Sequence, residues 1–396
     1  MAGSRLIHLQ SLSQLRAVAG KWDDLWWRSD VTMPTVRAEL VAQWVEQFAP
    51  QSRFHALVVE DQDQYVAALP LVDHRIAPLV QVGGLPSNEW APSGSLLLDE
   101  QADPHAVLDV LVEAIEELPW PLLWLDAACL QSAAWKTLLS ALERAGLKFA
   151  DHLRYRVGWL AVSGDWQQYQ NCWSRNHRQQ LRKFARRLEK EGALRVRIES
   201  TLAAEQVDVH LRRGFEVEDR NWKGRSGTSV LRTPGMYDFL LRQAQQLAQW
   251  GQLEIVTLEC QEMPMAFEYA WAAKGVYHSF KVGYDEQFAA FSPGQLLRYY
   301  LLERFHDEPV RRGIDFLGPL TGAVAKWRPE TYDVGRLVIA QRRPFGRALF
   351  CAYRHLWPQV RRMLGKPPLM DCSQAAARDS ESFEPLEGQL AESQVS

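Results

Sequence analysis

Hydrophobic positions along the chain follow helical spacing in some segments and strand-like spacing in others. In residues 35–48 the apolar side chains recur every three or four positions, which predicts an amphipathic helix. The runs FHALVVED and YVAALPLVDHRI follow, each rich in apolar and β-branched residues, and a short polar turn separates them as in a β-hairpin. Helices that alternate with strands in this way predict a mixed α/β fold.

A comparable order of elements begins again near Asp165. Residues 175–191 predict a helix, and the runs QLEIVTLEC, MPMAFEYAWAA and GVYHSFKVGY predict three consecutive strands. A helix over residues 295–308 and further strands follow. Because each half reads as helices, a β-meander, a helix and more strands, we infer a structural duplication, although no fixed-period repeat is visible.

The pattern divides the chain into four expected segments. They are a first domain over residues 1–162, a second over 163–343, a basic amphipathic helix over 344–364 and a disordered acidic tail over 365–396.

Composition and charge narrow the function. The 396 residues carry a formal net charge of −3, and the last segment holds six acids against two bases, so the remainder is close to neutral. A duplex-binding protein is normally strongly basic, so DNA is not an expected partner. No apolar run is long enough for a transmembrane helix and no secretory signal pattern opens the chain, so we expect a cytoplasmic location. The five cysteines lack metal-ligand spacing, so no metal is expected.

One loop has the features of a phosphate-binding site. The segment Phe291-Ser292-Pro293-Gly294 stands directly before the helix that starts near Gln295. Helix N-termini present free N–H groups and a partial positive charge, and glycine allows close backbone approach, so a phosphate fits there. Ordinary helix capping by Ser292 is the simpler explanation of the same residues.

The order of a meander, a loop at a helix start, that helix and another strand resembles the acyl-CoA site of Gcn5-related N-acetyltransferases. Residues 165–345 look more closely like the acetyltransferase domain of the cellulose-biosynthesis (CelD/BcsL-like) family, which is related to the FemAB-type aminoacyl transferases. The segments that carry the resemblance are Ser174–Arg187, Arg220–Trp222, Gly283–Asp285, Ser292–Leu297, Asp315–Gly318 and Lys326-Trp327. The first half then resembles the family's degenerate companion domain.

The resemblance implies a reaction and its donor. It implies an acyltransferase with acetyl-CoA as the donor, acting on the amine or hydroxyl of a sugar, an amino sugar or a polysaccharide precursor. The loop residues implied to bind the donor are Ser292, Pro293, Gly294, Gln295, Leu296 and Leu297. This loop holds one glycine where typical acetyltransferases have more, so it offers fewer open amides.

A row of arginines predicts a site for a phosphorylated ligand. Arg178 and Arg182, with Arg175 and Arg186, recur at three- and four-residue steps on one face of the helix over 175–191. Arginine makes bidentate contacts with phosphate, so this face could bind the CoA 3′-phosphate, a nucleotide-linked sugar or a tRNA acceptor stem. A solvated charged face explains the same pattern without a ligand.

Acyl transfer needs a base for the acceptor's proton and donors for the oxyanion. The candidate catalytic residues near the expected cleft are Glu268, Tyr284, Asp285, Asp315 and Lys326. By resemblance, Asp315 and Lys326 are the first to test. The resemblance implies that Arg220 and Trp222 border the acceptor pocket, whereas without it Trp222 is expected to be a core residue. His278 is the remaining candidate for substrate contact, although a structural histidine is the simpler interpretation.

Other enzyme classes lack their motifs. The sequence contains no Gly-x-Ser-x-Gly, Gly-x-x-x-x-Gly-Lys-Ser/Thr or Gly-x-Gly-x-x-Gly segment, which disfavours serine hydrolases, P-loop enzymes and dinucleotide binding. Two hypotheses are left: the acyltransferase above, with FemAB-like aminoacyl transfer as a variant, and a non-catalytic protein of the same fold that binds a component of polysaccharide synthesis. The pattern predicts no oligomeric state.

Overall fold

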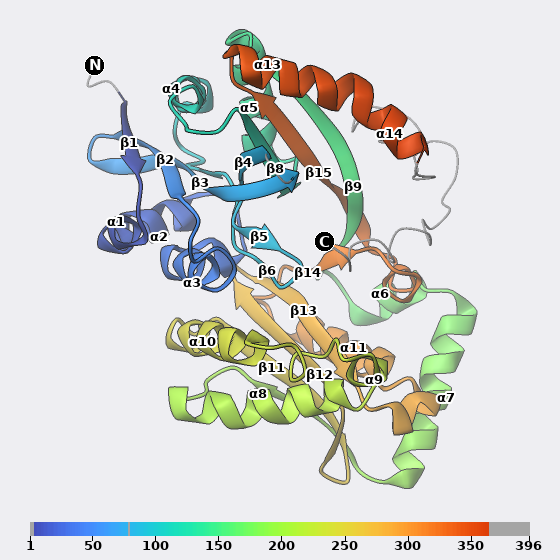
Figure 1. Cartoon of the computed structure of the whole chain (residues 1–396). Helices are drawn as coiled ribbons and strands as arrows, with labels where there is room; N and C mark the ends of the chain where they lie inside the picture. Colours follow the sequence, from blue (N-terminus) through green and yellow to red (C-terminus); the bar gives the residue numbers. More distant parts are fainter. Residues whose placement is uncertain (1–3, 78–79, 364–396) are drawn as a thin grey trace. The chain divides into compact units, whose positions relative to one another are not determined.

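The computed structural model describes residues 4–77 and 80–363, which form two units (Figure 1). Unit 1 contains the described residues up to Tyr155 together with those from Tyr332 onward, and unit 2 contains Arg156–Thr331. The tail expected over 365–396 lies outside the described residues. The chain passes from unit 1 to unit 2 between Tyr155 and Arg156, a few residues before the domain boundary expected at 162/163.

The elements of unit 1 come from both ends of the described chain. They are β1 (Arg5–Leu9), α1 (Leu12–Ala17), α2 (Ala19–Arg28), η1 (Pro34–Val36), α3 (Ala38–Phe48), β2 (Phe54–Asp61), β3 (Gln64–Ala77), β4 (Val80–Gly84), β5 (Ser87–Asn88), β6 (Ala91–Pro92), β7 (Leu97–Leu98), α4 (Pro104–Ile115), β8 (Leu122–Ala128), α5 (Ala133–Arg144), β15 (Glu330–Ala340), α13 (Pro344–Cys351), η3 (Ala352–Leu356) and α14 (Trp357–Met363).

The elements of unit 2 follow in chain order. They are the end of β9 (Lys148–Ala161), α6 (Trp166–Asn171), α7 (Arg175–Glu191), β10 (Leu194–Glu199), α8 (Ala204–Asp219), α9 (Trp222–Ser226), α10 (Met236–Gln249), β11 (Leu253–Cys260), β12 (Met263–Ala273), β13 (Val276–Tyr284), η2 (Glu286–Phe291), α11 (Pro293–Asp307), β14 (Gly313–Pro319) and α12 (Gly322–Ala325).

The two units repeat one sheet layout. In unit 1 the strand order is β1-β2-β3-β4-β8-β15, and in unit 2 it is β10-β11-β12-β13-β14-β9. In both, neighbouring strands are antiparallel except for the fourth and fifth, β4 with β8 and β13 with β14, which are parallel. The structure therefore confirms the mixed α/β class and its tandem arrangement.

The last strand of each sheet comes from across the unit boundary in sequence. β15 was expected within the second domain, but it pairs with β8 of unit 1, from Gly335 opposite Ala128 to Ala340 opposite Leu122. In unit 2 the same position is taken by the end of β9, which pairs with β14. Hydrophobic spacing does not show which sheet a strand joins, so the sequence could not predict this arrangement.

Helices cover both faces of the unit 2 sheet. α8 and α10 lie on one face and α11 on the other (Figure 1). The central strands β11 and β12 are consequently buried on both faces and read as nearly continuous apolar runs. Gly214 of α8 permits close approach of helix and sheet, because a Cβ there would lie 1.9 Å from a ring carbon of Phe267. This packing fixes the strands that carry most of the candidate site.

The helix expected over 344–364 is present as α13, the π-helical turn η3 and α14. Phe350 and Tyr353 pack against Trp124 and Val338 of the unit 1 sheet. Within residues 4–77 and 80–363 the structure contains no helix with the length and apolar character needed to cross a bilayer.

Candidate functional site

The parallel strands β13 and β14 separate part-way along their length. Their ladder covers only Val276–His278 and Gly313–Asp315, whereas β13 continues to Tyr284 and β14 to Pro319. An irregularity in β13 opposite Tyr269 and Ala270 accompanies the separation. The backbone of β13 beyond His278 therefore has no β14 partner, and most of the predicted catalytic residues lie on or next to these two strands.

A buried polar cluster lies next to this separation. Arg298 of α11 donates from Nη2 to both carboxylate oxygens of Glu268, at 2.9 and 2.8 Å, and to Ser279 Oγ at 2.8 Å. Glu268 and Arg298 are 1% and 7% exposed, and the guanidinium lies 4.9 Å from the ring centre of Phe316 on β14. The Nη1 atom of Arg298 is buried without a hydrogen-bond partner. Glu268 is thus neutralised by an ion pair, while Arg298 retains a free donor.

Arg298 was not among the candidate site residues predicted from the sequence. The run QLLRYYLLERF contains three charged residues, and Arg298 is the one that lies three and seven residues before the buried Leu301 and Phe305. That spacing places its side chain on the buried face of the helix, where a charge requires a partner. The charged residue at a core-facing position was therefore the available signal.

Asp315 and Lys326 differ in their surroundings. Asp315 is buried on β14, and its Oδ1 accepts the backbone N–H of Leu317 at 2.8 Å. Leu317 has φ of 56°, an unusual value for a branched residue, and this hydrogen bond supports the turn. Lys326 is exposed after α12. Burial lowers the pKa of the nearby His177, and the Lys326 ammonium lowers it further.

Asp285 and Arg220, predicted for separate roles, are brought together. Asp285 is buried, caps η2 through the N–H of Gln287 at 3.0 Å, and pairs with Arg220 Nε at 2.7 Å. Tyr284, the preceding residue, is half-buried against the unit 2 core. Trp222 is 51% exposed at the start of α9. The Asp285 carboxylate is therefore already engaged in holding α8 to the loop before α11.

The start of α11 has fewer free backbone N–H groups for a phosphate than the sequence suggested. Ser292 has a left-handed conformation, with φ of 49°, and its carbonyl accepts the N–H groups of Gln295 and Leu296 at 3.0 and 3.1 Å. The side chains of Leu296 and Leu297 are buried in the unit 2 core. Pro293 has no N–H, so Gly294 supplies the open amide of this turn. Gly294 is exposed, and a Cβ there would meet nothing within 4 Å.

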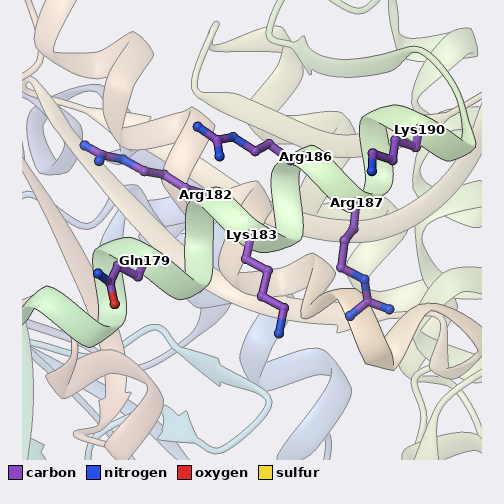
Figure 2. A pocket seen from close by; sticks show the side chains of 6 residues that line it. All are labelled: Gln179, Arg182, Lys183, Arg186, Arg187 and Lys190. Atoms are coloured by element: carbon purple, nitrogen blue, oxygen red, sulfur yellow. The ribbon is translucent and has the colours of Figure 1, made fainter.

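A basic cavity lies along helix α7. Ser174 caps the helix, and Leu181 and Leu188 turn its apolar face into the core. The cavity measures about 370 Å³, and it is lined by Gln179, Arg182, Lys183, Arg186, Arg187 and Lys190 (Figure 2). In Figure 2, Lys183 and Arg187 extend to one side of the helix and Arg182 and Arg186 to the other. The lining residues include five cations and no acid, so the surface here is positively charged and suits an anion.

The basic cavity adjoins the start of α11. The Arg187 guanidinium lies 5.1 Å from the ring centre of Phe291, the residue before Ser292, and α7 packs against η2 and α11. Of the two predicted arginines, Arg182 lines the cavity, whereas Arg178 donates to Asn171 Oδ1 at 2.9 Å. Lys183, Arg187 and Lys190 were missed because only the single row of arginines was considered.

His278 is fully buried on β13, in register with Asp315. Its ring lies near that of Trp271, and burial lowers its pKa to about 3. The imidazole is consequently neutral at physiological pH and is enclosed by the core. This placement fits a structural histidine better than contact with a substrate.

The buried His278 predicts a dependence of stability on pH. Above its ordinary pKa of 6.5 the side chain is neutral in both the folded and unfolded states. Between pH 6.5 and about 3 the unfolded chain binds a proton that the folded protein does not, so the folded state loses stability as the pH falls. Replacing His278 by leucine should reduce the acid-side slope of the unfolding free energy by about 1.4 kcal/mol per pH unit. Urea titrations at several pH values measure this slope, and an unchanged slope would show that His278 does not titrate in this way.

Comparison with known proteins finds a similar domain. Residues 175–326 match the family model described as the acetyltransferase (GNAT) domain. None of the curated proteins matches the chain. The matched segment lies within unit 2 and contains α7, strands β13 and β14, α11 and Lys326, so this part of the chain is the part similar to that domain.

Solved structures show the same fold. FemX superposes with a TM-score of 0.53 at 9% identity, over 84% of this chain and 96% of that one. A conserved protein of unknown function from Bacteroides thetaiotaomicron gives 0.51 at 12% identity, over 86% and 100%. The C-terminal domain of a lysylphosphatidylglycerol synthetase candidate from Agrobacterium fabrum gives 0.50 at 13% identity, over 86% and 96%. At these identities the likeness concerns the fold alone.

Proposed function

We propose that unit 2 is an acyltransferase that binds a CoA thioester, with acetyl-CoA as the donor, and transfers the acyl group to an amine or hydroxyl of a sugar, an amino sugar or a polysaccharide precursor. The observation that carries this proposal is the contact of Arg187 with Phe291, which joins the basic cavity of α7 to the start of α11. Both lie within the segment that matches the acetyltransferase domain.

The donor's phosphates are assigned to the basic cavity. Arg182, Arg186 and Arg187 can each make bidentate contacts with phosphate oxygens, and the exposed Gly294 lets a diphosphate approach the helix start. Because Gly294 supplies the open amide there, side chains of α7 provide most of the binding energy in this proposal. Acetyltransferases with glycine-rich loops rely more on backbone amides.

The reacting carbonyl of the donor is assigned to the place where strands β13 and β14 separate. The acceptor's nitrogen or oxygen attacks the thioester carbon, the C–S bond breaks, and the CoA thiolate leaves while the acceptor's proton passes to a base. The free Nη1 of Arg298 can donate to the carbonyl oxygen as it gains negative charge. Asp315, Tyr284 and Lys326 are the proposed groups for the proton. Glu268 and Asp285 are held by arginines and are assigned positioning roles.

Calorimetric titration with acetyl-CoA and with CoA tests the proposal. The substitution Gly294→Phe should leave the fold intact, because its Cβ enters open space, and should weaken binding at least about tenfold by blocking the helix start. Gly20→Phe is the matched control, since a Cβ at Gly20 also meets nothing within 4 Å but lies on α2 in unit 1. Full affinity in Gly294→Phe would refute the assigned site. Absence of any heat with the folded wild-type protein would instead favour the non-catalytic hypothesis.

A second candidate, FemAB-like transfer from an aminoacyl-tRNA, is favoured by the same five cations. A tRNA acceptor stem contacts more phosphates than CoA, and each contact adds to the salt dependence of binding. Titration of aminoacyl-tRNA and of acetyl-CoA over a range of salt concentrations separates the two. Binding of the tRNA alone, with a steep salt dependence, would select aminoacyl transfer.

A further inference from the structure

We propose that the C-terminal helix, from α13 through η3 to α14, docks the protein on the surface of an anionic lipid bilayer. Its inner face is fixed on unit 1. A Cβ at Gly346 would lie 2.6 Å from the backbone oxygen of Pro121, and Phe350 and Tyr353 are buried. Because these residues already hold the helix in place, its remaining apolar side chains are not needed for the core.

The outward surface of this helix is unusually apolar. Phe345 is 62% exposed, Leu356 58%, Trp357 39% and Met363 84%. Among residues 4–77 and 80–363 these four belong to a small group of exposed large apolar side chains. Isolated exposed apolar residues are ordinary, but several of them on one short helix indicate an interaction surface.

The charge of the same helix is uniformly positive. The sequence contains no acidic residue between Asp333 and Asp371. Arg347, Arg354 and Arg362 are exposed, and none of them has an ion-pair partner within the described part of the chain. A helix that exposes apolar side chains, arginines and a tryptophan is typical of helices that lie in the interface of an anionic membrane.

Other occupants fit this surface less well. A second copy of the helix would bring arginines against arginines, and like charges in contact oppose association. A nucleic acid would satisfy the arginines but would leave the exposed Leu356 and Met363 without a function. An anionic bilayer accommodates both, because the headgroups pair with the arginines while the apolar side chains enter the acyl boundary.

Cosedimentation of the full-length protein with lipid vesicles tests this proposal. The protein should partition onto mixed phosphatidylcholine and phosphatidylglycerol vesicles and much less onto phosphatidylcholine alone. The triple variant Arg347→Gln, Arg354→Gln, Arg362→Gln should lower partitioning roughly 100-fold, at about fivefold for each arginine. The triple variant Phe345→Ser, Leu356→Ser, Met363→Ser should lower it at least about tenfold.

Two matched controls locate the effect. Arg182→Gln, Arg186→Gln, Arg187→Gln removes the same charge from the other basic surface, and Val209→Ser, Val310→Ser removes exposed apolar groups from unit 2. Both controls should bind vesicles like the wild type, and thermal melts should confirm that every variant is folded. The proposal is overturned if the wild type does not bind anionic vesicles, if the helix variants bind as well as the wild type, or if the helix binds RNA in preference to vesicles.

Discussion

Replacing Arg298 by methionine is expected to lower the free energy of unfolding by ~3–5 kcal/mol. The substitution leaves the Glu268 carboxylate, which is 1% exposed, without the guanidinium that accounts for both of its short contacts. A buried charge that loses its partner retains the full cost of desolvation. Urea unfolding of the full-length protein, followed by tryptophan fluorescence, measures the change.

The double variant Glu268→Leu, Arg298→Met separates stability from function. Because both charges are replaced by apolar groups of similar size, it should recover most of the stability lost in the single variant. It should still lack turnover, since the free Nη1 donor is gone. A single variant as stable as the wild type would show that the pair is not buried as described. Full turnover in the double variant would remove Arg298 from the proposed reaction.

Reversing two charges in the basic cavity is expected to weaken donor binding roughly 100-fold or more, because each charge-assisted hydrogen bond contributes about 1.5–3 kcal/mol. The variant is Arg182→Glu, Arg186→Glu. Both residues are exposed and line the cavity, so the fold should tolerate the change while a phosphate is repelled. Calorimetry with acetyl-CoA at constant ionic strength measures the loss.

The control for this variant is Arg175→Glu, Arg195→Glu. It has the same change in net charge within unit 2, at exposed positions that do not line the cavity. If both variants lose affinity equally, the effect is one of overall charge, and the cavity is not the donor site. Retained affinity in Arg182→Glu, Arg186→Glu would exclude the cavity directly.

The local pattern of the sequence predicted much of the fold. The helix expected over 175–191 agrees with α7, and the three expected strands of the second half are β11, β12 and β13. Local periodicity determined these elements because each buries one face or both. The pairing of β15 with β8 depends on contacts between residues some 200 positions apart. The spacing of hydrophobic residues within a segment does not indicate which distant strand that segment pairs with.

The site was predicted less completely than the fold. Side-chain chemistry drew attention to Arg182, which lines the basic cavity, and to the loop before α11, since cations and a glycine at a helix start have visible signatures. The partners of Glu268 and Asp285 could not be predicted, because Arg298 and Arg220 reach them from other elements. The number of open amides at Gly294 also depends on the left-handed conformation of Ser292, which the sequence does not reveal.

The central claim, that unit 2 holds a CoA thioester between α7 and the start of α11, is tested most directly by hydrogen–deuterium exchange with and without acetyl-CoA. The account predicts slower exchange in peptides that cover residues 176–190 and 286–297, with the peptides of unit 1 unchanged. If saturating acetyl-CoA slows exchange in neither segment, or slows it only in unit 1, the result contradicts the central claim.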